Sequence, residues 1–105
     1  MRRAASIDSN QPSIVDWARK LGFSVTITSG AGGGFPDTAF GIWDQVFLPE
    51  IKDPAKPPSK RKLTPAQERW HGEWKGHKCI IETSDDVVAL YDLAKRRAKL
   101  LGVIA

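Results

Sequence analysis

The segment from residue 32 to residue 52, GGGFPDTAFGIWDQVFLPEIK, constrains the fold more than any other part of the chain. It holds two runs of β-branched and aromatic residues that are separated by the short polar pair Asp44–Gln45. Such runs favour strands, and a short polar break between two of them predicts an antiparallel hairpin. Asp37 stands at the start of the first strand, and Glu50 and Lys52 stand at the end of the second.

The register of this hairpin decides which side chains meet. With Asp44–Gln45 as the turn, Asp37 lies opposite Lys52, and Glu50 lies opposite Ala39. Asp37 and Glu50 then become diagonal neighbours about 7–8 Å apart at the backbone. Because alternate residues of a strand share a face, Asp37, Glu50 and Lys52 are expected on the same face of the hairpin.

Two carboxylates at this separation can share a hard cation. Mg²⁺ prefers oxygen ligands and is usually held by one or two carboxylates together with water and a substrate phosphate. Lys52 can orient the attacking water or neutralise charge that develops on the phosphate. The alternative is an ordinary surface ion pair between Asp37 and Lys52, because a lone Glu-x-Lys tripeptide is a weak signal.

Three segments of the chain resemble, in the right order, the restriction-endonuclease-like superfamily. Gly-Phe-Pro-Asp at 34–37, followed by Pro-Glu-Ile-Lys at 49–52, resembles its Pro-Asp…(Asp/Glu)-x-Lys signature. Residues 57–71 resemble the loop and helix that follow this signature in small stand-alone VRR-NUC nucleases of phages and bacteria, which are related to Holliday-junction resolvases. Residues 2–15 resemble their first segment, so the resemblance covers about residues 2–91.

The resemblance implies an α/β fold with a restriction-endonuclease-like core: a mixed four-stranded sheet flanked by helices, in the order α-β-β-β-α-β plus a C-terminal helix. It also implies a Mg²⁺- or Mn²⁺-dependent DNA endonuclease, expected to act as a homodimer on branched DNA such as a Holliday junction, fork or flap. The site residues that it implies are Asp37, Glu50, Lys52, Gln67 and Gln11, with the backbone carbonyl of Ile51 as a further metal ligand.

Gln11 departs from the family pattern. Relatives often carry a glutamate at this position, three residues before an Ile-Val pair, and a neutral amide cannot supply its charge. Two interpretations of Gln11 stay open: it holds a metal-bound water or a phosphate, or it only caps the helix. Asp8 is the nearest acid that could replace the missing glutamate.

A basic, proline-rich segment from Asp53 to Lys62 follows the expected site and is predicted to be a loop. Its cations suit phosphates, although charged loops often serve only solubility. The glycine run at 30–34 lacks the Lys-Ser/Thr of a nucleotide loop, which excludes a nucleotide cofactor; it either lets a DNA backbone approach closely or flexes. The expected DNA contacts are Lys56, Lys60, Arg61, Lys62, Gly33 and Gly34.

Local patterns predict the remaining elements. A helix is expected over 11–21, a strand over 23–28, a fourth strand over 78–83, and a last helix capped by Ser84 or Asp85. Thr64 and Gln67 form the pattern of a capping box, which gives Gln67 a structural role beside the one that the resemblance implies. Pro49 cannot donate to a sheet and predicts a bulge or kink just before Glu50.

The side chains of the predicted third helix and of the C-terminal tail carry further expectations. Trp70 and Trp74, one helical turn apart, are predicted in the core. His71 and His77 are expected to face solvent, and contact with DNA stays open as the alternative for either. The apolar tail from Leu100 to Ile104 is expected to pack against a second subunit.

Composition bounds the rest. With 105 residues and a net charge of +4, the chain is expected to form one nuclease domain over 1–105, with 1–9 loosely held. The single cysteine, Cys79, excludes an internal disulfide and predicts a buried, inert thiol. No signal peptide or membrane span is visible, so a cytoplasmic location is expected. Two other function classes stay open: a DNA-binding module whose nuclease site has decayed, and a small protein that docks on a partner enzyme.

Overall fold

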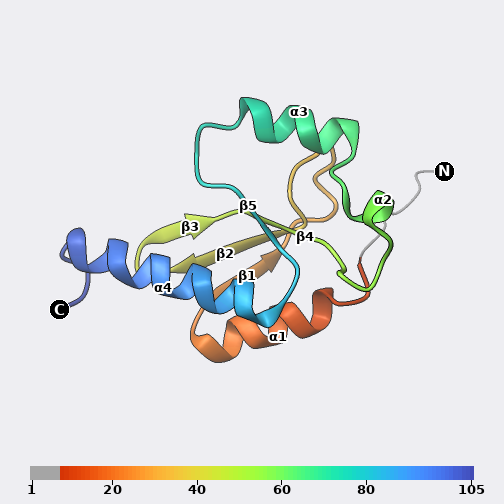
Figure 1. Cartoon of the computed structure of the whole chain (residues 1–105). Coiled ribbons are helices and arrows are strands. Elements are labelled where there is room, and N and C mark those ends of the chain that lie inside the picture. The colour runs from red at the N-terminus through yellow and green to blue at the C-terminus, as the bar shows by residue number, and fades with distance from the viewer. Residues whose placement is uncertain (1–7) are drawn as a thin grey trace.

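The computed structural model describes residues 8–105, and the expectations for residues 1–7 lie outside the described residues. The chain is an α/β protein, as predicted (Figure 1). Its elements in order are α1 (Gln11–Leu21), β1 (Ser24–Ile27), β2 (Thr38–Ile42), β3 (Gln45–Phe47), β4 (Pro49–Ile51), α2 (Pro58–Arg61), α3 (Pro65–Glu73), β5 (Cys79–Ile81) and α4 (Ser84–Leu100).

The strands form two small sheets. The sequence analysis instead predicts a single mixed four-stranded sheet. β1, β2 and β3 pair antiparallel in that order, and β4 pairs in parallel with β5. Figure 1 shows α1 and α4 together on one side of the strands and α3 on the other side. The predicted sheet differs because the third strand is divided and its second half has another partner.

The hairpin turn lies at Trp43–Asp44, so the prediction of an Asp44–Gln45 turn is wrong. Both turn residues have positive φ, 47° and 59°, as a two-residue hairpin loop requires. Gln45 belongs to β3, and its side-chain amide donates to the carbonyl of Ala94 at 2.8 Å. The Trp43 ring packs on Tyr91 with ring centres 5.3 Å apart, a contact that helps to hold this turn.

The third strand is interrupted at Leu48, between β3 and β4. Pro49 has no N–H to continue the antiparallel ladder, and the interruption agrees with the kink predicted before Glu50. In β4, Pro49 pairs with Cys79 and Glu50 with Ile80. The backbone N–H of Lys52 extends this contact by donating to the carbonyl of Ile81 at 3.0 Å. The break therefore redirects the chain from the hairpin to β5.

The core lies between the three-stranded sheet, α1 and α4. The Phe23 ring lies at its centre, 5.3 Å from Phe40, 6.4 Å from Phe47 and 6.2 Å from Tyr91. The predicted range of α1 is confirmed, and Gly22 ends that helix in the left-handed conformation. The buried aliphatic side chains around Phe23 are Ile14, Val15, Ala18, Ile51, Ile81, Val87, Leu90 and Ala94.

The structure differs in detail from three local predictions of the sequence analysis. The segment 53–62 contains the short helix α2, where a loop is predicted. The N-cap of α4 is Thr83, because its hydroxyl, and not that of Ser84, accepts from the N–H of Asp86. Cys79 is half-buried, where a fully buried thiol is predicted, and burial raises the pKa of this thiol to about 11, which keeps it protonated at neutral pH.

The C-terminal end of α4 carries exposed apolar side chains. Leu100 is 88% exposed, and Leu101 and Val103 are exposed too. Burial of this end against a second subunit stays a prediction. Among the helices of residues 8–105, none is both long and apolar enough to cross a membrane.

Helix α3 lies outside the core, so the prediction that Trp70 and Trp74 are core residues is wrong. None of its residues is buried. The loop between β1 and β2 supports the helix: the Phe35 ring contacts Trp70 with ring centres 5.4 Å apart. Gly34 lies directly against the first turn, where an added Cβ would be 2.2 Å from the carbonyl oxygen of Ala66.

Gly34→Ala and Gly33→Ala form a matched pair that tests this contact. Both positions have positive φ, +81° and +65°, so each alanine costs about 1–2 kcal/mol of strain. Only Gly34 has a neighbour in the way, since nothing lies within 4 Å of a Cβ at Gly33. We expect Gly34→Ala to lower the free energy of unfolding in urea by clearly more than Gly33→Ala. Equal losses would show that Gly34 does not hold α3.

Candidate active site

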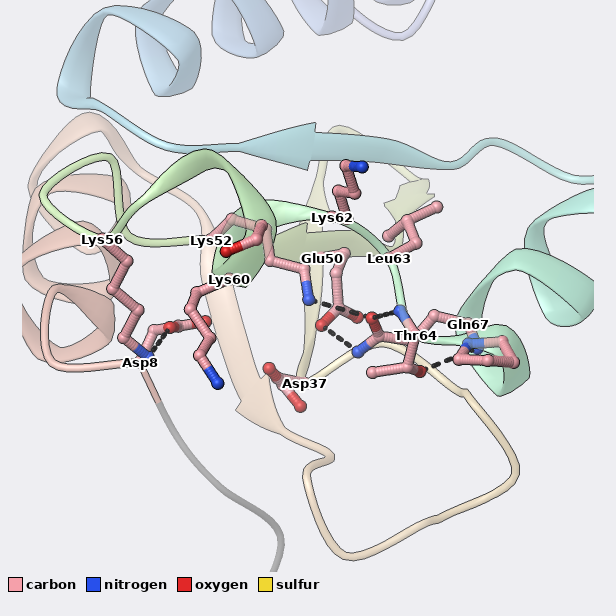
Figure 2. A pocket seen from close by; sticks show the side chains of 12 residues that line it. Asp8, Asp37, Glu50, Lys52, Lys56, Lys60, Lys62, Leu63, Thr64 and Gln67 are labelled. Atoms are coloured by element: carbon pink, nitrogen blue, oxygen red, sulfur yellow. Dashed lines mark hydrogen bonds and ion pairs between the residues drawn. The ribbon is translucent and has the colours of Figure 1, made fainter.

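A cleft of about 510 Å³ opens between the end of β4 and the start of α3 (Figure 2). The carboxylates that line it are those of Asp8, Asp37 and Glu50, and the cations are those of Lys52, Lys56, Lys60 and Lys62. Gln67 and Thr64 of the α3 start form one wall. The cleft therefore combines acidic groups at its base with lysines around them.

Asp37 is held in place by Thr28, the residue that directly follows β1. The backbone N–H of Thr28 donates to the carbonyl of Asp37 at 2.8 Å, and the Thr28 hydroxyl donates to the carbonyl of Pro36 at 2.7 Å. These bonds lock the backbone on both sides of the Pro36–Asp37 peptide. Asp37 thus enters the site from a rigid strand end, although a glycine-rich loop precedes it.

The hairpin register brings Asp37 closer to Glu50 than predicted. Because the turn lies one residue earlier than expected, pairing partners shift by two, and Asp37 is not opposite Lys52. Extension of the observed register beyond the ladder places Asp37 across from Glu50. The Thr38 hydroxyl donates to the carbonyl of Pro49 at 3.0 Å and holds these two segments together. A shift by two conserves the faces, so Asp37, Glu50 and Lys52 still line one cleft.

The Glu50 side chain is only 1% exposed, and its surroundings favour the protonated form. Burial, followed by the negative charge of Asp37, raises the pKa of Glu50 to about 8, against the opposing effect of Lys52. Burial also raises the pKa of Asp37, while a hydrogen bond with Glu50 opposes that rise. At neutral pH the two carboxyl groups therefore share one proton between them.

Gln67 connects the carboxylate pair to the lysine. Its Nε2 donates to Glu50 Oε1 at 2.8 Å, and its Oε1 accepts from Lys52 Nζ at 2.9 Å. The same Oε1 accepts from the backbone N–H of Thr64 at 2.9 Å, and the Thr64 hydroxyl accepts from the N–H of Gln67. The predicted capping box is confirmed. Gln67 thus caps α3 and contacts Glu50 and Lys52 at the same time.

The segment before α1 closes the other side of the cleft. Asp8 forms an ion pair with Lys56 at 2.5 Å, and the Ser9 hydroxyl donates to Asp53 at 2.6 Å. The Asn10 amide donates to the carbonyls of Lys52 and Glu82, at 3.0 Å each. Residues 8 and 9 are therefore held against the rest of the domain, although the sequence analysis predicts that residues 1–9 are loosely held.

Gln11 does not line this cleft, whereas Asp8 does. Gln11 is 4% exposed, its Oε1 has no hydrogen-bond partner, and it borders a separate hollow beside Asp16 and Arg19. The N-cap of α1 is Asn10, so the interpretation of Gln11 as the cap is wrong. Of the two residues considered for the missing acid, Asp8 is the one whose carboxylate reaches the site.

The predicted DNA contacts separate into two groups. Lys56, Lys60 and Lys62 line the cleft, whereas Arg61 forms an ion pair with Glu82 at 3.6 Å. Gly33 is exposed with open space around it, and the close approach that Gly34 permits is to α3. Sequence reasoning missed the hydrogen bonds of the Asn10 amide to the carbonyls of Lys52 and Glu82. The Thr-Pro start of α3 marks Thr64 as a cap, but no local signal shows that its helix reaches Glu50.

The donor set fits a hard cation. Glu50 Oε2 is buried and accepts no hydrogen bond from an N–H group of the described residues, so a proton, a water molecule or a cation is needed to satisfy it. The carbonyl of Ile51 belongs to the same strand, and its side chain is fully buried. Within residues 8–105 no three His, Cys, Asp or Glu side chains gather closely enough for a metal. A cation here would rely on two carboxylates, backbone and water, which suits Mg²⁺.

Comparison with protein-family models, with curated proteins and with solved structures finds no match for this chain.

The proton shared by Glu50 predicts how stability depends on pH when no metal is present. The folded protein keeps a proton that an unfolded glutamate releases above its pKa of 4.5. The free energy of unfolding in EDTA should therefore fall by several kcal/mol as the pH rises from 4.5 to about 8. In Glu50→Gln this fall should be much smaller, as urea unfolding at several pH values will show.

Glu68→Gln provides the control, because it removes an exposed glutamate of α3. This variant should keep the pH dependence of the wild type. A Glu50→Gln variant with an undiminished pH dependence would contradict the buried, proton-sharing state.

Proposed function

We propose that this chain is a Mg²⁺- or Mn²⁺-dependent endonuclease that hydrolyses phosphodiester bonds in DNA. The observation that carries the proposal is the pair of Asp37 and the buried Glu50, which Gln67 connects to Lys52, in an open cleft edged by lysines. The resemblance of residues 34–37 and 49–52 to the Pro-Asp…(Asp/Glu)-x-Lys signature supports the same chemistry.

Each side chain has a distinct task in this proposal. Asp37 and Glu50 hold the cation, with the Ile51 carbonyl as a further ligand. When bound, Mg²⁺ would supply charge that polarises the scissile phosphate and lowers the pKa of a water. Asp37 and Glu50 would both have to be ionised to hold it, because a carboxyl group binds a metal in its deprotonated form.

A hydrogen bond to Gln67 fixes the ammonium group of Lys52, which is proposed to act at the reacting phosphate. Its side chain is 7% exposed, and Gln67 accepts one of its three N–H bonds. The remaining N–H groups can orient the attacking water or stabilise the charge on the phosphate oxygens. Lys60 and Lys62 lie at the cleft edge, where they can bind the flanking phosphates.

The assembly and the substrate belong to the proposal as well. The resemblance favours a homodimer on branched DNA such as a Holliday junction or fork. The exposed apolar end of α4, at Leu100 and Leu101, offers a surface that a second subunit could bury. A cytoplasmic location fits this function.

A second candidate function is a DNA-binding module without catalysis. The observation that favours it is Gln11, which stands where the relatives carry a glutamate and does not line the cleft. Such a module would bind DNA equally well with or without Mg²⁺. A small docking protein, the third class, would show no DNA affinity even at low salt.

Cleavage of labelled duplex, fork and four-way-junction DNA, in Mg²⁺, Mn²⁺ or EDTA, tests the proposal. We expect cutting that requires metal and that falls at least about 100-fold in Asp37→Asn and in Lys52→Ala, since each removes a group that stabilises charge in the transition state. Lys20→Ala, which removes an exposed lysine of α1, should cut like the wild type. DNA binding without cutting by the wild type would exclude the nuclease and favour the binding module.

A further inference from the structure

The face of α3 that reaches the active site continues beyond it as an aromatic stripe. Gln67, Trp70, His71 and Trp74 follow the spacing i, i+3, i+4 and i+7, which places them on one side of the helix. Gln67 lies in the cleft, and Trp74 follows the last residue of α3. With a rise of 1.5 Å per residue, the stripe leads about 10 Å away from the cleft.

Other parts of the protein leave this stripe partly uncovered. The indoles of Trp70 and Trp74 are stacked, with ring centres 5.1 Å apart and an angle of 18° between the planes. Phe35 contacts Trp70 from one side, yet Trp74 remains 37% exposed. Two large indoles that are stacked on each other but not buried in the core form a preformed apolar surface beside a polar cleft.

The charge around this surface is complementary to a polyanion. The segment 58–78 contains six Lys and Arg residues and two Glu residues, so its net charge of +4 equals that of the entire chain. Burial lowers the pKa of the His71 imidazole, and the positive charges of Lys78 and Lys52 lower it further. Both lysines therefore lie near enough to His71 to act on its charge. Positive charge therefore extends from Lys52 in the cleft, past His71, to Lys78 near the indoles.

Lys78 is fixed at the end of the stripe. Its ammonium group donates to the carbonyl of Trp74 at 2.5 Å, which keeps the cation close to the indole pair. The two acids of the helix, Glu68 and Glu73, lie off the stripe, because their positions fall about 110° from its centre on either side. The stripe itself thus carries no acidic side chain, and Lys52 and Lys78 contact its two ends, at Gln67 and at Trp74.

We propose that this face of α3 binds an unpaired nucleic-acid strand as the strand leaves the cleft. Bases contact the indoles of Trp70 and Trp74, while Lys52 and Lys78 face phosphates. A base can reach an aromatic side chain in this way only when it is not stacked inside a duplex. The inference rests on the proposed function, because it assigns a substrate class to the same cleft: DNA with a single-stranded segment next to the cut.

Fluorescence anisotropy with labelled oligothymidylate and with a blunt duplex, at low salt in EDTA, tests the surface without catalysis. Trp74→Ala should weaken binding of the oligothymidylate about tenfold, a loss typical of one base–aromatic contact, and should weaken duplex binding by less. Trp74→Phe keeps an aromatic ring and should retain most of the affinity.

Trp17→Ala is the matched control. Trp17 is 41% exposed, close to the value for Trp74, and it belongs to α1, on the opposite side of the strands from α3 (Figure 1). This variant should bind both probes like the wild type. Equal effects of Trp17→Ala and Trp74→Ala, or equal losses on both probes, would overturn the proposal. So would sedimentation showing a dimer that Trp74→Ala dissociates, because the stripe would then serve self-association.

The same proteins separate this inference from the proposed function. If the wild type cuts DNA with Mg²⁺ but Trp74→Ala binds oligothymidylate normally, only the strand-binding surface is refuted. If the wild type binds oligothymidylate through Trp74 but cuts no DNA, only the nuclease is refuted.

Discussion

The burial of one carboxylate, that of Glu50, is the constraint on which the rest of the site depends. A charged carboxylate without partners in a protein interior costs several kcal/mol, so the fold must supply a proton, a cation or hydrogen-bond donors. Gln67 supplies one donor, and a proton shared with Asp37 supplies a second contact. The second oxygen of Glu50 accepts no hydrogen bond from an N–H group of the described residues, and this unsatisfied oxygen supports the proposed metal site.

The partners of Glu50 come from segments that are far apart in the chain. Asp37 is held by Thr28 of the preceding loop, and Gln67 is positioned by the capping box that begins α3. Asn10 joins the start of α1 to the carbonyls that follow β4 and β5. Hydrogen bonds therefore hold residues 8–10 and the start of α3 around the cleft, and the ring contact between Phe35 and Trp70 adds apolar support to α3. The hydrophobic core on the other side of the strands supports this arrangement without contributing to its chemistry.

The features that sequence predicts well here are local. The range of α1, the capping box at Thr64 and the break before Glu50 each follow from residues that are adjacent in the chain. The shared face of Asp37 and Glu50 also holds, because an error of two residues in the register leaves side-chain alternation unchanged. The turn was missed because a tertiary contact, Trp43 on Tyr91, stabilises two non-glycine residues at positive φ. The exposure of Trp74 was missed for a related reason, since spacing shows a stripe but not what lies opposite it.

The division of one strand between two sheets has a consequence for the order of folding. The β2–β3 hairpin closes across two residues, whereas the pairing of Pro49 with Cys79 must close a loop of about 30 residues. Pairings that are close in sequence form faster than distant ones, because less chain entropy is lost before contacts form. The hairpin is thus expected to form early and the pairing that encloses Glu50 late. A nascent chain would form its core strands before its cleft, so the proposed metal site would be completed only as folding ends.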